Sequence, residues 1–133
     1  MNTRTFRALG LSIVFLWFFG GGVGHFVFDD FFIRIVPPYI PDAAMAVYVS
    51  GVFEILLAVG VLIAATRRWA GYGLILLTLA VTPANVHMWL HPEQFPEMPY
   101  WALSLRLVIQ VLLLICIWWS TKPAPPTAAA HSG

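Results

Sequence analysis

The sequence predicts an all-α membrane protein that folds as a four-transmembrane-helix, up-and-down bundle. Of its 133 residues, 60% are hydrophobic and only 10% are charged, whereas a soluble domain carries about a quarter charged residues. In addition, four stretches stay apolar for the roughly 20 residues that a helix needs to cross a bilayer. Such a chain has too few polar residues to cover a water-exposed surface, so we expect the lipid bilayer to be its main partner.

The predicted spans lie at about 6–28, 43–65, 69–90 and 100–119, and only the first connection is long. That connection, residues 29–42, reads DDFFIRIVPPYIPD, and its three prolines exclude a long helix. It is expected either to form an outer interfacial lid or to pack on the bundle as an apolar loop. Residues 1–121 would form the transmembrane domain, and the proline- and alanine-rich residues 122–133 a disordered tail.

The first span also has features of a signal peptide, because Arg4 and Arg7 precede its apolar stretch. However, that stretch continues past Gly24, and no small-x-small cleavage site is evident. We therefore expect a retained transmembrane helix.

Basic residues predict the orientation of the spans. Arg4 and Arg7 precede the first span, Arg67 and Arg68 join the second to the third, and Lys122 follows the fourth. The other two connections hold mainly acidic residues. By the positive-inside rule, both termini would be cytoplasmic.

Every span brings a polar side chain into the outer half of the predicted bundle. Measured from the outer ends, His25 lies about 5 Å deep, Asn85 and Arg106 about 8 Å, and Glu54 and Gln110 about 15 Å. An isolated charge inside the membrane costs roughly 3 kcal/mol on insertion scales. We therefore expect a buried Glu54–Arg106 ion pair, with the other three residues completing its hydrogen bonds. This network would be either a ligand or proton site or a structural link between helices.

Other motifs are weaker indications of function. His87 and His91 are four residues apart, as metal ligands on one helix face can be, but Pro92 follows directly and structural zinc usually needs four ligands. We expect no metal there. The stretch GGGVG, residues 20–24, contains a small-xxx-small pair, Gly20 and Gly24, that would permit close helix approach.

Two function classes are excluded by composition. A net charge of +1 without a basic stripe gives no indication of nucleic-acid binding. A single cysteine, Cys116, excludes an internal disulfide and a dithiol redox pair within this chain.

Four motifs together resemble the DoxX family of small bacterial membrane proteins. They are GHF (24–26), IVPPYIP (35–41), VYVSGVFEI (47–55) and TPANVHM (82–88). The resemblance implies a four-helix bundle in the bacterial inner membrane. Some members of that family are linked to thiosulfate:quinone oxidoreductase and others to thiol and oxidative-stress systems. His25, Glu54 and Asn85 match its recurrent polar positions.

These observations favour an accessory component of a membrane redox or oxidative-stress system. It would bind a quinone-like or other amphipathic small molecule in the outer half of the bundle, and a redox partner protein would supply electrons. A small-molecule or proton-coupled transporter, which would act as a homo-oligomer, is the main alternative. A membrane enzyme with Glu54 and His25 as acid and base, and a purely structural subunit, also remain open.

Overall fold

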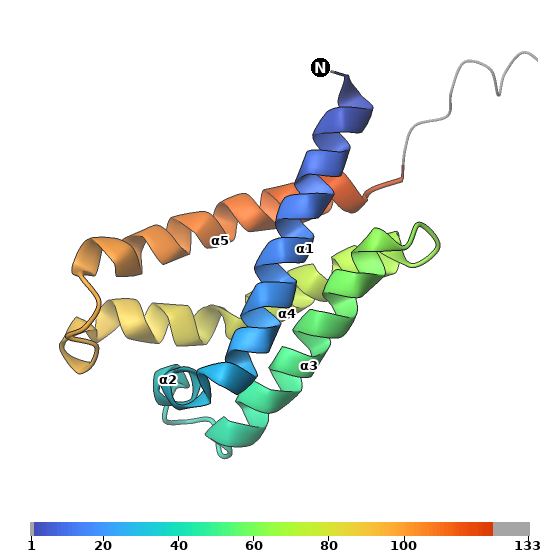
Figure 1. Ribbon diagram of the computed structural model, residues 1–133. Coiled ribbons are helices and arrows are strands. Elements are labelled where there is room, and N and C mark those ends of the chain that lie inside the picture. The colour runs from blue at the N-terminus through green and yellow to red at the C-terminus, as the bar shows by residue number, and fades with distance from the viewer. Residues whose placement is uncertain (1, 124–133) are drawn as a thin grey trace, which may run out of the picture.

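The computed structural model describes residues 2–123, and within that range the regular elements are all helical (Figure 1). They are α1 (Thr3–Val27), α2 (Asp29–Ile35), α3 (Ala43–Leu62), α4 (Arg67–Leu90), the 3₁₀ helix η1 (Pro92–Gln94) and α5 (Tyr100–Thr121). Helices α1, α3, α4 and α5 are long and apolar enough to cross a membrane. The all-α class and the presence of four helices that could span a membrane are thus confirmed. Most of the expected tail, residues 124–133, lies outside the described residues.

Side-chain caps fix where two of the long helices begin. Asn2 accepts a hydrogen bond from the Thr5 backbone N–H at 2.9 Å, and Asp42 accepts one from the Met45 N–H at 3.0 Å. Such caps satisfy backbone donors that have no partner inside the helix. Pro83 lies within α4, which continues through it to Leu90.

The long helices are arranged as two pairs, α1 with α3 and α4 with α5, and α3 also contacts α4 while α1 contacts α5. In Figure 1 the two pairs come together near the α3–α4 connection and diverge toward α2. Buried apolar side chains from all four helices fill the convergent end: Leu11, Val14, Phe18, Ala58, Val61, Ala70, Leu74 and Ile117. The two helix pairs are therefore packed together at one end and lie apart at the other.

Glycines set the close approach of α1 to α3. A Cβ added at Gly22 would lie 2.7 Å from Cγ1 of Ile55 and 2.9 Å from the carbonyl oxygen of Gly51. By contrast, one added at Gly20 would meet nothing within 4 Å, and one at Gly24 would meet the Phe32 ring no closer than 3.6 Å. The expectation that Gly20 and Gly24 form the close contact was wrong, because Gly22 is the residue that faces α3.

The short helix α2 covers the divergent end of the molecule. Its last residue, Ile35, is buried in a second apolar cluster with Met88, Phe95 and Leu103, which come from α4, η1 and its flank, and α5. An exposed ion pair between Arg34 and Glu97 adds to this contact. Residues 29–42 therefore begin with a seven-residue helix packed on the bundle, which neither the expected lid nor the expected loop included.

Candidate ligand pocket between the helix pairs

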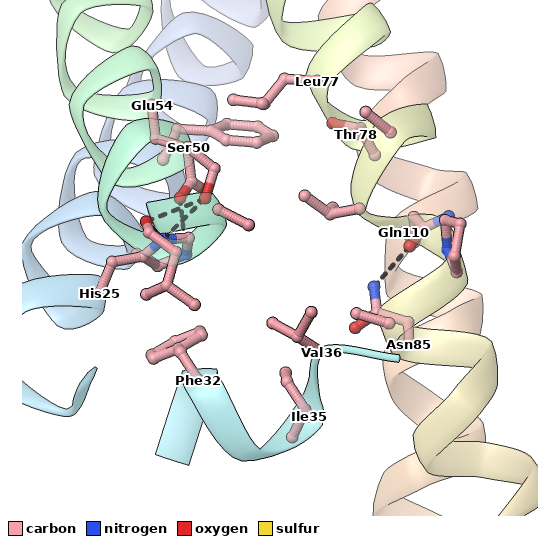
Figure 2. Close-up of a pocket in the computed structure, with 18 of the residues that line it drawn as sticks. His25, Phe32, Ile35, Val36, Ser50, Glu54, Leu77, Thr78, Asn85 and Gln110 are labelled. Atoms are coloured by element: carbon pink, nitrogen blue, oxygen red, sulfur yellow. Dashed lines mark hydrogen bonds and ion pairs between the residues drawn. The ribbon is translucent and has the colours of Figure 1, made fainter. Parts of the chain in front are cut away.

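A cavity of about 710 Å³ lies between the two helix pairs and is bordered by α2. Its lining includes residues of all five α-helices (Figure 2). The five polar residues selected from the sequence all line it: His25, Glu54, Asn85, Arg106 and Gln110. They do not form one network but two, which occupy opposite walls in Figure 2.

The first polar group joins α1 to α3. Nε2 of His25 lies 2.8 Å from Oε2 of Glu54, and both side chains are largely buried, with 9% and 13% of their surface exposed. On its other side, Nδ1 of His25 lies 2.9 Å from the carbonyl oxygen of Val47 and 3.1 Å from Oγ of Ser50. The close contact at Gly22 and Gly51 brings the two helices near enough for these bonds.

These contacts determine how many protons the His25–Glu54 pair holds. A carbonyl oxygen can only accept, so Nδ1 must carry a hydrogen that it donates to Val47. At 2.8 Å two bare lone pairs would repel, so one more proton lies on Nε2 of His25 or on Glu54. Either placement, imidazolium with carboxylate or imidazole with carboxylic acid, gives a pair with no net charge. Burial of Glu54 in an apolar helix is explained by this neutrality.

The Glu54 carboxylate is nevertheless not fully satisfied. Among the described residues, its buried Oε2 has the 2.8 Å contact with Nε2 of His25 and accepts no further hydrogen bond. Its side chain borders the cavity.

The second polar group joins α4 to α5 through a chain of hydrogen bonds. Nη2 of Arg106 donates to Oδ1 of Asn85 at 3.2 Å, and Nδ2 of Asn85 donates to Oε1 of Gln110 at 2.6 Å. Nε2 of Gln110 then donates to Oγ1 of Thr82 at 2.6 Å, which in turn donates to the Thr78 carbonyl at 2.9 Å. Each hydrogen bond of the chain is thus donated in the same direction, from the Arg106 guanidinium toward the Thr78 carbonyl oxygen.

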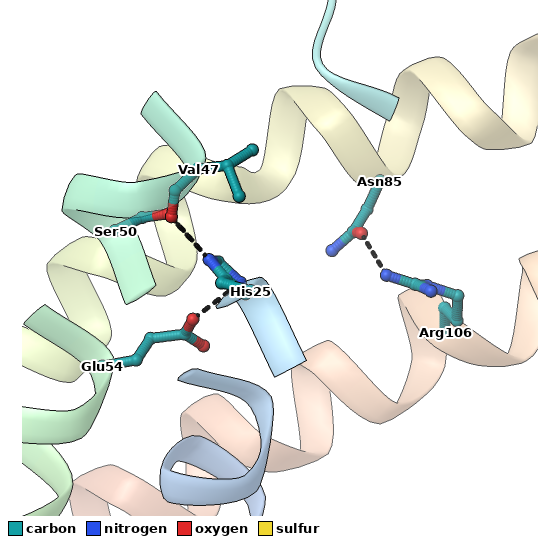
Figure 3. A network of polar contacts seen from close by, with 6 residues as sticks. All are labelled: His25, Val47, Ser50, Glu54, Asn85 and Arg106. Carbon is teal, nitrogen blue, oxygen red and sulfur yellow. Dashed lines mark hydrogen bonds and ion pairs between the residues drawn. The ribbon is translucent and has the colours of Figure 1, made fainter. Parts of the chain in front are cut away.

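The predicted Glu54–Arg106 ion pair was wrong. Glu54 pairs with His25 on one wall, and Arg106 contacts Asn85 on the other (Figure 3). Within residues 2–123, the ion pairs are His25–Glu54 and Arg34–Glu97, so no carboxylate there pairs with Arg106. Asn85 and Gln110 do form hydrogen bonds with each other, but in the arginine's group and not with Glu54.

Sequence reasoning missed three contributors to these groups. The Val47 carbonyl, a backbone atom, has no sequence signature. Thr82 and Thr78 were not selected, although Thr78, Thr82 and Asn85 follow one another at spacings of four and three and so share a helix face. Thr82 lies inside the TPANVHM motif, and this position was the signal that could have identified it as a site residue.

His87 and His91 lie away from the residues that line the cavity. Their rings pack at 4.5 Å between centroids, and Nδ1 of His91 faces the His87 carbonyl oxygen at 3.0 Å. No cluster of three or more His, Cys, Asp or Glu residues that could hold a metal occurs in the described part of the chain. The two histidines thus contact each other at the C-terminal end of α4, where His91 is the C-cap residue.

Apolar side chains complete the cavity and extend it to the outside of the molecule. Leu77, Val81 and Leu113 contribute to its apolar lining, and Leu16 and Trp17 of α1 line it while remaining 68% and 50% exposed. In a membrane, such exposed apolar residues would face acyl chains. The cavity therefore has two polar walls and an apolar rim.

Comparison with known proteins gives a family without a described activity. No curated protein and no solved structure matches the chain. A family model described as a domain of unknown function, DUF8561, matches residues 3–121, which include every helix described above. On this match, the chain belongs to the DUF8561 family.

Proposed function

We propose that this protein binds a small amphipathic molecule in the cavity between its two helix pairs. The observation that carries the proposal is the cavity itself, which combines polar side chains from four spans with apolar walls. Sites for small molecules are typically mostly apolar clefts of about 300–1,000 Å³ with a few placed polar groups. The volume of about 710 Å³ falls inside this range.

The two polar walls would fix the orientation of the bound molecule. Arg106 would donate to an acceptor on its polar end, since a guanidinium has five N–H donors and the described contacts of this side chain use one on Asn85. The apolar ring or tail would contact Leu77, Val81 and Leu113. A quinone-like molecule, with carbonyl acceptors on an apolar ring, is one class with this chemistry.

The proposed setting is a bacterial inner membrane, with the spans alternating in direction and both termini in the cytoplasm. This orientation follows from Arg4, Arg7, Arg67, Arg68 and Lys122 under the positive-inside rule. It would place the cavity in the outer half of the bilayer. Reporter fusions to each connection would test it, and an outward-facing 63–66 connection would contradict it.

We further propose an accessory role in a membrane redox system, with a partner protein supplying electrons. This role derives from the resemblance to DoxX proteins, which stays a prediction beside the DUF8561 assignment. A proton-coupled transporter is a second candidate because His25 and Glu54, two ionisable residues 2.8 Å apart, lie together on the cavity wall. A transporter would move protons into sealed vesicles, whereas a binding subunit would not.

Native mass spectrometry of the gently extracted protein tests the binding proposal. The wild type is expected to retain a small molecule. Gly21→Leu is expected to lose it, because Gly21 lines the cavity and a leucine side chain there would occupy part of it. The Cβ itself would make an ordinary contact, 3.5 Å from Oε1 of Glu54, and thermal unfolding would confirm that the variant is folded. The matched control is Val23→Leu, since Val23 is exposed on the same helix outside the lining.

The proposal would be overturned if the wild type carried no small molecule and took up none from added lipid or quinone. Equal retention by the wild type and Gly21→Leu would place the bound molecule elsewhere. In the first case a purely structural subunit becomes the better account.

A further inference from the structure

The charge balance of the cavity points to the class of molecule that it holds. We infer that the ligand is a single-chain amphiphile with a carboxylate head group, bound through Arg106. This inference rests on the proposed function, because it names the ligand of the same cavity. It differs from a quinone-like ligand, which is neutral.

The first step is that the cavity carries one uncompensated positive charge. The His25–Glu54 pair is neutral wherever its shared proton lies, so Glu54 offers no net charge to balance Arg106. Glu54 is also the one acidic residue among those that line the cavity, so no other described carboxylate there can balance Arg106. A monoanionic ligand would bring the cavity to zero net charge.

The second step is the donor geometry of the guanidinium. Its fork can form two parallel hydrogen bonds with a carboxylate, and such charge-assisted bonds are stronger than bonds between neutral groups. In the structure, Nη2 of Arg106 contacts the Asn85 amide oxygen at 3.2 Å. Gln110 and Thr82 then continue the same chain of donors, so the network supplies no negative charge to the arginine. A quinone carbonyl would accept a bond but leave the charge unbalanced.

The third step is the path for an apolar chain. Beyond the polar walls, the apolar lining includes Leu77, Val81 and Leu113, and it reaches Leu16 and Trp17, which are exposed on the outside of α1. Gly20 also lines the cavity, and a Cβ there would meet nothing within 4 Å. An alkyl chain could therefore run from Arg106 along apolar side chains to the bilayer.

The test compares ligands that differ only in the head group. Binding of palmitate, hexadecanol, decylubiquinone and phosphatidylglycerol would be measured on the full-length protein in detergent micelles. Palmitate is expected to bind at least about tenfold more tightly than hexadecanol to the wild type, as a charge-assisted pair would give. In Arg106→Leu this ratio should fall to about one while hexadecanol binding is retained.

The matched control is Arg68→Leu, which removes an arginine that lies over Tyr72 and Trp118, far from the cavity lining. It should keep the palmitate preference. Arg106→Gln provides a second variant that retains a hydrogen-bond donor without the charge, and thermal unfolding of each variant would confirm that it is folded. The preference should be lost in this variant too.

The possible outcomes separate this inference from the proposed function. If decylubiquinone or phosphatidylglycerol bound the wild type more tightly than palmitate, the carboxylate assignment would be overturned, while binding in the cavity would stand. A palmitate preference that persisted in Arg106→Leu would also overturn the assignment. If no probe bound the wild type, the proposed function itself would fail.

Discussion

The contact between α1 and α3 at Gly22 is the packing feature that a single methyl group should disrupt. In Gly22→Ala the new Cβ would lie 2.7 Å from Cγ1 of Ile55, 2.9 Å from the Gly51 carbonyl oxygen and 3.1 Å from Cβ of Glu54. Because one of these neighbours is backbone, side-chain rotation cannot remove the overlap. The helices must separate, which would also lengthen the His25–Glu54 contact.

The magnitude follows from comparison with Gly20→Ala. At Gly20 the same methyl group would meet nothing within 4 Å. Both substitutions bring the same gain in helix propensity, about 1 kcal/mol, so this gain cancels in the difference. What remains is the overpacking at Gly22, which typically costs about 1–3 kcal/mol. Gly22→Ala should therefore be less stable than Gly20→Ala by that amount.

The assay is reversible unfolding in mixed micelles with increasing sodium dodecyl sulfate, followed by circular dichroism. The free energy of unfolding of the two variants would be compared with that of the wild type. If Gly22→Ala and Gly20→Ala had the same stability, the two helices would not be in the close contact described here. The explanation of how His25 reaches Glu54 would then lose its basis.

Two further predictions concern charged side chains. In a double-mutant cycle, His25→Ala and Glu54→Gln should show a coupling energy of about 0.5–3 kcal/mol, because the two residues are in contact. The effects of Glu54→Gln and Arg106→Leu on the free energy of unfolding should instead be additive within about 0.5 kcal/mol. Additivity of the first pair would contradict the structure. Arg34→Gln should lower the free energy of unfolding by less than about 1 kcal/mol, because the Arg34 side chain is 49% exposed and its ion pair is screened by water. A larger loss would mean that α2 depends on this ion pair more than on its apolar contacts.

The four spans could be predicted because hydropathy and length alone determine them. The expected spans at about 43–65 and 100–119 correspond to α3, Ala43–Leu62, and α5, Tyr100–Thr121. Residues 29–42 were harder, since their prolines exclude a long helix but allow the seven-residue α2 before the first proline. Neither the lid nor the loop predicted for residues 29–42 included this short helix.

The partner of Glu54 could not be predicted from depth. Depth along a helix is one coordinate, and it says nothing of which face a side chain occupies or which helices are neighbours. Depths measured from the helix ends also require that all outer ends lie at the same height in the membrane. On that basis, the rise per residue places His25 about 10 Å above Glu54. The contact at Gly22 and Gly51 aligns α1 and α3 differently and brings His25 beside Glu54. The four-residue spacing of Ser50 and Glu54, and of Arg106 and Gln110, places each pair on one helix face, and each pair does belong to a single polar group.

Photolabelling tests the central claim, that the cavity between the helix pairs is a ligand site, most directly. A long-chain amphiphile with a photoreactive group on its chain would be bound to the full-length protein and its attachment sites mapped by mass spectrometry. The account predicts labelling of the cavity lining on α1 and α4, and loss of that labelling in Gly21→Leu. These lining residues are Leu16, Trp17, Phe18, Gly20 and Gly21 on α1, and Leu77, Thr78, Ala80 and Val81 on α4. Labelling spread evenly over lipid-facing residues such as Val49, Val52 and Phe53, and unchanged in Gly21→Leu, would contradict it.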